Sequence, residues 1–100
     1  MNITIKNHGQ ETLVLLEGRL DTNTSPELEK KIAELFDKGV KVITFDFNDL
    51  EYISSAGLRV LLSTQKQINN MVGEMKIVNI SNDIREIFNM TGFNDFLTLE

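Results

Sequence analysis

The residues best suited to chemistry in this sequence are two adjacent serines, Ser54 and Ser55, within the stretch EYISSAGLRVLL (residues 51–62). An apolar run precedes them, and a helical pattern begins at the small residues Ala56 and Gly57. A serine in this position can cap a helix, act as a nucleophile or accept a phosphate. Each role requires different neighbours.

The sequence offers little support for a nucleophilic serine. Such a serine needs a base beside it, and the single histidine, His8, falls in an expected surface turn far along the chain. There is no G-x-S-x-G elbow, no glycine-rich phosphate loop of either common spacing, and no cysteine. We therefore expect a protein that is not an enzyme and that needs no cofactor.

Metal binding is also poorly supported. His8 is expected to be solvated, and the absence of cysteine removes thiolate ligands. The carboxylates Asp46, Asp49 and Glu51 lie near the serines, so a weak Mg²⁺ site is conceivable there. A solvated or capping role is the favoured interpretation, and no metal site is predicted.

Capping and phosphorylation remain as explanations of the serine pair. Ser54 alone would satisfy the cap, which contributes about 1 kcal/mol, and this leaves Ser55 in excess. The partial positive charge of a helix N-terminus tolerates an added phosphate, which brings about −1.5 to −2 charges. Ala56 and Gly57 would leave the backbone open to a docking partner. The residues alone leave a phosphorylation switch and a plain cap both open.

Composition indicates one soluble domain spanning residues 1–100, which we expect to be cytoplasmic. The chain is 41% hydrophobic and 25% charged, with a formal net charge of −5. This acidic balance argues against direct nucleic-acid binding. No apolar run approaches a membrane span, and the N-terminus lacks a signal-peptide pattern.

Periodicity predicts an α/β domain in the order β-β-α-β-α-β-α-β, with helices over a mixed sheet. Ser25 is the expected N-cap of the first helix, ahead of Pro26. Val72 is expected in the buried stripe of the second helix, and the strand over 12–18 is expected to be covered on both faces. The predicted strands are 2–7, 12–18, 40–47, 74–80 and an edge strand within 93–100; the predicted helices are 25–39, 55–71 and 81–92, and 48–54 is predicted as a loop.

Two separated motifs resemble the STAS domain of bacterial anti-sigma-factor antagonists. DFNDLEYISSAGLRVLL (residues 46–62) is similar to the family signature, which runs from a strand-end aspartate to a serine-containing helix start. EGRLDTNTSPELE (residues 17–29) is similar to the family's glycine-x-leucine-aspartate loop. The element order agrees with that family along the whole chain.

The resemblance implies a binding module that is switched by phosphorylation. Family members bind an anti-sigma factor that is also a serine kinase, and so release the sigma factor. The kinase phosphorylates the antagonist, and a PP2C-type phosphatase restores it. By position, the phosphate acceptor is Ser55 in preference to Ser54, and Asp46 is the strand-end aspartate. The implied partner-binding residues are Asp21, Thr22, Asn23, Thr24, Ser54, Ser55, Ala56, Gly57, Leu58 and Arg59.

Three residues depart from the family pattern. Asn48 stands where serine is usual, Ser54 where aspartate is usual, and Ala56 where a second serine or threonine is frequent. The alternative to an anti-sigma-factor antagonist is therefore a STAS scaffold or adaptor without a phosphorylation switch, in another signalling or transport assembly.

Overall fold

The chain folds as one mixed α/β domain, described by a computed structural model over residues 1–95 and 97–99. The sheet has the order β1-β2-β3-β4, in which β1 and β2 are antiparallel and the β2–β3 and β3–β4 pairs are parallel. The elements, in chain order, are β1 (Asn2–His8), β2 (Glu11–Leu20), α1 (Ser25–Asp37), β3 (Val42–Ile53), α2 (Ser55–Asn70), β4 (Glu74–Val78), α3 (Asn82–Thr91) and a 3₁₀ helix η1 (Phe93–Asp95). The predicted fold class and element order are thereby confirmed up to α3.

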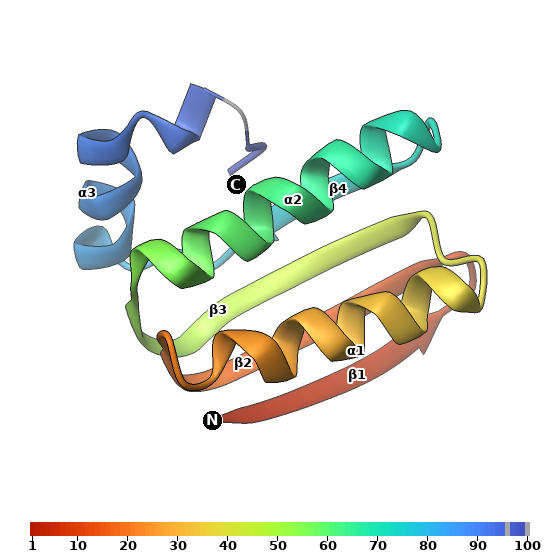
Figure 1. Cartoon of the computed structure of the whole chain (residues 1–100), viewed down its shortest axis with the longest axis horizontal. Coiled ribbons are helices and arrows are strands. Elements are labelled where there is room, and N and C mark those ends of the chain that lie inside the picture. The colour runs from red at the N-terminus through yellow and green to blue at the C-terminus, as the bar shows by residue number, and fades with distance from the viewer. Residues whose placement is uncertain (96, 100) are drawn as a thin grey trace.

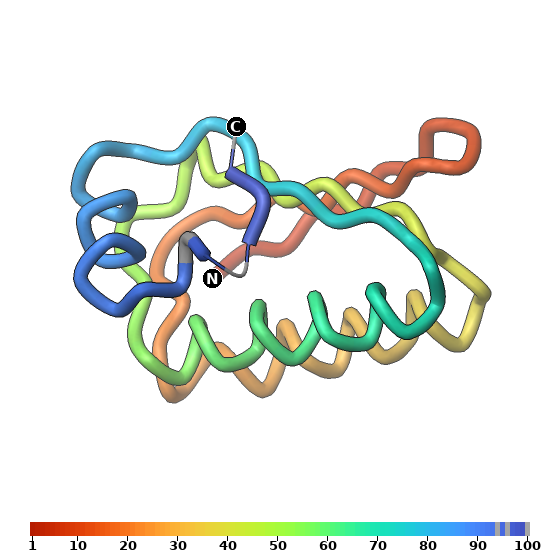
Figure 2. Tube along the Cα trace, turned by 90° about the horizontal axis from the view of Figure 1, so that it is seen from above, coloured from red at the N-terminus to blue at the C-terminus, as the bar shows by residue number. Residues whose placement is uncertain are grey.

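Both long helices cover the same face of the sheet, where they lie side by side (Figure 1). Figure 2 shows the same arrangement from above, with the strands on one side and α1 and α2 on the other. The crossovers from β2 to β3 and from β3 to β4 step across the sheet in the same direction. Because such crossovers are right-handed, two steps in one direction place both helices on one face.

The core therefore lies between the helices and a single face of the sheet. Val14 and Leu16 of β2 point into it and are buried, whereas Leu13 and Leu15 point to the opposite face and are only half-buried. The prediction that this strand is covered on both faces was wrong, because no helix of the described chain lies over the second face. α3 closes one end of the core, where Phe88 packs 6.4 Å from Phe47 between ring centroids.

β3 is longer than its sequence suggested. The segment predicted as a loop, 48–54, continues the strand as far as Ile53, and Tyr52 still pairs with Arg19 of β2. The turn-forming residues Asn48 and Asp49 lie beside a register shift, where β3 carries an extra residue. A β-bulge absorbs such residues without ending the ladder, and turn propensity alone does not reveal this.

Two details at the helix ends also differ from expectation. Thr24, not Ser25, is the N-cap of α1, and Ser25 is a buried first residue whose hydroxyl donates to the carbonyl oxygen of Asp21. α2 ends at Asn70, so Val72 lies beyond it with a positive φ of 55° and 91% of its surface exposed. The predicted place of Val72 in the buried stripe was wrong, while Leu58, Leu61 and Ile68 are buried as expected.

The C-terminal tail forms less than the predicted edge strand. After η1, the described residues make one parallel bridge, between Ile77 of β4 and Leu99. The remainder of that prediction falls partly on residues 96 and 100, which lie outside the described residues. Within the described chain, no helix is both long and apolar enough to cross a membrane.

Candidate functional site

The two serines have different environments at the start of α2. Ser54 is the N-cap, with an extended backbone (φ −99°, ψ 174°), and its Oγ accepts a hydrogen bond from the backbone N–H of Gly57 at 3.4 Å. Ser55 is the first helical residue and its side chain is exposed. The Oγ of Ser54 is engaged in the cap, whereas Ser55 is exposed.

Asp21 organises the turn between β2 and α1. Its Oδ1 accepts hydrogen bonds from the backbone N–H groups of Asn23 (2.9 Å) and Thr24 (3.1 Å). The hydroxyl of Thr24 donates to the carbonyl oxygen of Arg19 at 2.7 Å and accepts from the N–H of Asp21 at 2.9 Å. The hydrogen bond from the Thr24 backbone is the main cause that lowers the pKa of Asp21 below its ordinary value. Hydrogen bonds to the ionised carboxylate of Asp21 therefore hold the conformation of this turn.

The structure brings this turn and the serines together. The backbone N–H of Ser54 donates to the carbonyl oxygen of Leu20 at 2.9 Å. Leu20 and Ile53 are also register partners in the parallel pair of β2 and β3. Parallel strands carry their C-terminal connections to the same edge of the sheet, so the starts of α1 and α2 lie beside each other (Figure 1).

Arg19 and Tyr52 extend this region, and sequence reasoning missed both as site residues. The guanidinium of Arg19 lies 4.3 Å from the centre of the Tyr52 ring, and its Nε is 3.9 Å from Asp21 Oδ2. Tyr52 is 37% exposed, and the exposed fraction of the Arg19 side chain is 60%. Arg19 lies inside one of the two family-like motifs and Tyr52 inside the other, and this was the sequence signal that could have identified them as site residues. We call the residues Arg19, Asp21, Thr22, Asn23, Tyr52, Ser54 and Ser55 the serine–aspartate surface.

Not every residue implied by the family resemblance is accessible. Thr22, Asn23 and Arg59 are exposed, and Thr24 and Ala56 are partly buried. Gly57 and Leu58 are buried. A Cβ on Gly57 would stand 2.7 Å from Leu20 Cγ and 3.0 Å from Ile53 Cγ1, so this glycine is required by internal packing. The two buried residues support the site from below and present little side-chain surface to a partner.

Asp46 does not join the serines. It lies within β3, seven residues before Ile53, which corresponds to roughly 20 Å of strand. Its Oδ1 accepts from the backbone N–H of Asn48 (2.9 Å) and from the side-chain Nδ2 of Asn79 (3.1 Å). Asp46 therefore ties β3 to the connection between β4 and α3. Within residues 1–95 and 97–99, no group of three or more His, Asp or Glu side chains could hold a metal ion, so Asp46, Asp49 and Glu51 form no such site.

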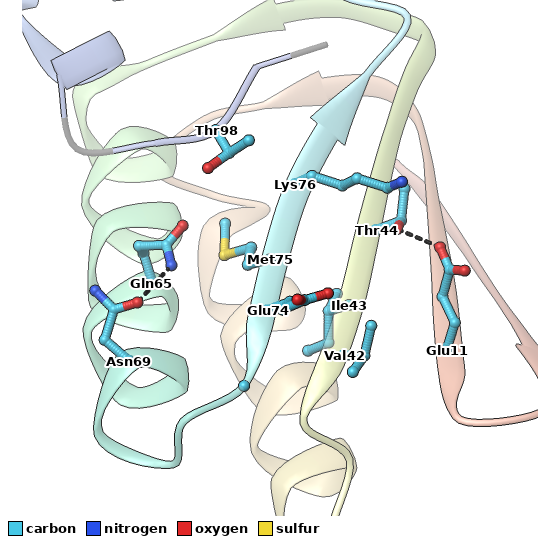
Figure 3. A pocket seen from close by; sticks show the side chains of 11 residues that line it. Glu11, Val42, Ile43, Thr44, Gln65, Asn69, Glu74, Met75, Lys76 and Thr98 are labelled. Atoms are coloured by element: carbon cyan, nitrogen blue, oxygen red, sulfur yellow. Dashed lines mark hydrogen bonds between the residues drawn. The ribbon is translucent and has the colours of Figure 1, made fainter.

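A separate cleft of about 390 Å³ lies at the β4 edge of the sheet, near the C-terminal end of α2 (Figure 3). Gln65 donates to Asn69 Oδ1 at 3.0 Å there, and the buried Oε1 of Gln65 has no hydrogen-bond partner. On the other side of β4 from Gln65, the hydroxyl of Thr44 in β3 donates to the carboxylate of Glu11 in β2. Ten residues of helix, about 15 Å, separate Gln65 from Ser55. The lining of the cleft also includes the charged residues Glu11, Glu74 and Lys76.

Comparisons with known proteins agree with this geometry. The chain matches the STAS domain family over residues 2–100. BtrV of Bordetella bronchiseptica, a candidate anti-sigma factor antagonist by name, is 33% identical over 93 residues, covering 93% of this chain and 80% of BtrV. The anti-sigma-B factor antagonist of Bacillus subtilis is 26% identical over 99 residues, covering 99% of this chain and 90% of the relative.

Solved structures show the same fold. The anti-sigma factor antagonist SpoIIAA superposes in its unphosphorylated form with a TM-score of 0.79 at 19% identity, covering 99% of this chain and 87% of SpoIIAA. The phosphorylated form of SpoIIAA from Bacillus superposes with a TM-score of 0.78 at 19% identity, covering 99% and 91%. The chain belongs to the STAS domain family and, within it, to the anti-sigma factor antagonists.

Proposed function

We propose that this protein binds an anti-sigma factor through the serine–aspartate surface and that phosphorylation of Ser55 ends the binding. The observation that carries the proposal is the exposed Ser55 hydroxyl at the first position of α2, joined to the Asp21 turn by the Ser54–Leu20 backbone hydrogen bond. Binding would free the sigma factor that the anti-sigma factor otherwise holds.

The partner acts as a serine kinase in this proposal. The γ-phosphoryl group of ATP passes to Ser55 Oγ: the bond from the γ-phosphorus to the ADP oxygen breaks, a new O–P bond forms, and the hydroxyl proton passes to a base of the kinase. A PP2C-type phosphatase returns the serine by hydrolysis with water. No nucleotide need bind this chain on its own, and the antagonist itself needs no catalytic residue.

The position of Ser55 explains how a phosphate would disrupt binding. Ser55 stands beside the ionised Asp21 turn, and a phosphate adds about −1.5 to −2 charges there. A docked partner would have to desolvate this dianion next to an existing carboxylate. Each 1.4 kcal/mol lost weakens binding about tenfold, so a few kcal/mol are sufficient to separate the two proteins.

Incubation with the cognate anti-sigma factor and ATP, followed by mass-spectrometric assignment of the modified residue, tests the proposal. We expect phosphate on Ser55 and none on Ser54. Ser55→Ala should bind in the presence of ATP as it does without it, and Ser55→Asp should bind at least tenfold more weakly than the unmodified protein.

Ser63→Asp is the matched control. Ser63 is exposed on the same helix, about 12 Å further along, so it receives the same charge outside the serine–aspartate surface and should leave binding unchanged. If neither Ser55 substitution alters binding and no phosphate appears, the alternative holds: a STAS adaptor whose serines only begin a helix.

A further inference from the structure

We propose that Arg59 is the intramolecular partner of a phosphate on Ser55: the two exposed side chains lie one helical turn apart on α2, so that a phosphoryl group on Ser55 closes an ion pair with the Arg59 guanidinium. The inference rests on the proposed phosphorylation of Ser55. It adds a specific role for Arg59, which lies next to the serine–aspartate surface.

The helix geometry favours contact between these two side chains. Ser55 and Arg59 are separated by four residues in α2, and both are exposed. Residues at i and i+4 have Cβ atoms about 5–6 Å apart. Helical side chains lean toward the helix N-terminus, so the Arg59 side chain leans toward Ser55.

Arg59 is available for such a contact. Of the described residues, none forms an ion pair with Arg59, whereas Arg19 is paired with Asp21. The planar guanidinium donates paired hydrogen bonds that match phosphate oxygens, and these charge-assisted bonds are stronger than neutral ones.

The arrangement is specific to Ser55. Four residues after Ser54 comes Leu58, which is buried, so a phosphate on Ser54 would find no cation one turn along the helix. Ser63 is followed by Lys66 three residues on and by the neutral Gln67 four residues on, so of these three serines only Ser55 has an arginine one turn along the helix. Phosphorylation of Ser55 would therefore add a dianion to the surface and also engage Arg59, which would no longer be free to contact a partner.

The charged groups on the elements packed around this end of α2 are mixed in sign. Arg19 and Asp21 lie at the end of β2, Glu51 on β3, and Glu29 on the face of α1 that meets α2. The acidic groups raise the second pKa of a nearby phosphate and Arg19 lowers it, in the wild type and in an Arg59 variant alike. The difference between the two proteins therefore isolates Arg59.

The test is a ³¹P NMR titration of the full chain with phosphoserine installed at position 55 during translation, so that no kinase is needed. We expect the second pKa of the phosphate to be about 0.3 pH unit lower in the wild type than in Arg59→Gln, as for a surface i, i+4 ion pair. Arg59→Lys should retain part of the shift. In 1 M NaCl the difference should shrink, because salt screens exposed pairs.

Two controls make the result decisive. Lys66→Gln removes an exposed cation about 16 Å from Ser55 along α2, and it should leave the second pKa of the phosphate unchanged. Phosphoserine at position 54 should give the same pKa with and without Arg59. Equal phosphate pKa values in the wild type and Arg59→Gln at low salt overturn the proposal. Failure of phosphoserine-55 protein to lose partner binding would instead overturn the proposed function, because the titration needs no partner.

Discussion

The side chain of Leu20 packs against the α carbon of Gly57, so closely that a Cβ at position 57 would stand 2.7 Å from Leu20 Cγ and 2.9 Å from Leu20 Cδ2. This contact joins the end of β2 to the first turn of α2. It holds the Asp21 turn beside the serines from within the core.

Gly57→Ala should destabilise the protein because the new methyl group overpacks this contact. Overpacking costs about 1–3 kcal/mol, and alanine recovers about 1 kcal/mol of helix propensity, so we expect a net loss of about 1 kcal/mol in the free energy of unfolding. Urea unfolding measures it. In a Leu20→Ala background the same change should cost less, because only the 3.0 Å approach to Ile53 Cγ1 remains. An equal loss in both backgrounds would show that Leu20 is not the obstacle.

Ser54→Ala and Ser55→Ala should differ in stability although they are neighbours. Ser54 accepts the capping hydrogen bond from Gly57 N–H, so its removal should cost about 1 kcal/mol, while loss of the exposed Ser55 hydroxyl should be nearly neutral. Ser54→Asp should retain the cap, since aspartate is an equally good N-cap. Equal unfolding midpoints for the two alanine variants would contradict this division of roles.

Asp21 should give the protein an acid-sensitive component of stability. Its pKa is lower in the folded state than the ordinary 3.8, so the stabilisation is complete above the unfolded-state pKa and is lost as pH falls through the folded value. Asp21→Asn can accept the same backbone hydrogen bonds but does not titrate. Between about pH 4.5 and pH 2 the wild type should lose more unfolding free energy than Asp21→Asn; parallel pH profiles would argue against the assignment.

Val72→Asn should stabilise the protein. Val72 has a φ of 55°, which a β-branched residue adopts only under strain, and its side chain is 91% exposed. Asparagine tolerates this conformation, so we expect a gain of about 1 kcal/mol in thermal or urea unfolding. Val72→Ile keeps the β-branch and should show no gain. If Val72→Asn is also neutral, the backbone there is unstrained.

Local patterns in the sequence determined most of the secondary structure. The apolar spacing and the caps located α1, α2 and α3 to within a few residues. Ser54 caps α2 as expected, and Ser81 caps α3 by accepting a hydrogen bond from Ile84 N–H. Helix caps and periodicity act between residues a few positions apart, so they can be read without a fold. The motif around residues 51–62 likewise identified the serine pair from its neighbours alone.

Only the tertiary structure decided which residues of the site are accessible and which support it. The pairing of β2 with β3 extended the strand through the expected loop and placed Tyr52 beneath the guanidinium of Arg19. The same pairing brought Leu20 under Gly57, so a glycine interpreted as clearance for a partner is in fact required by the core. These contacts join residues more than thirty positions apart, and their geometry depends on sheet register, which local sequence does not encode.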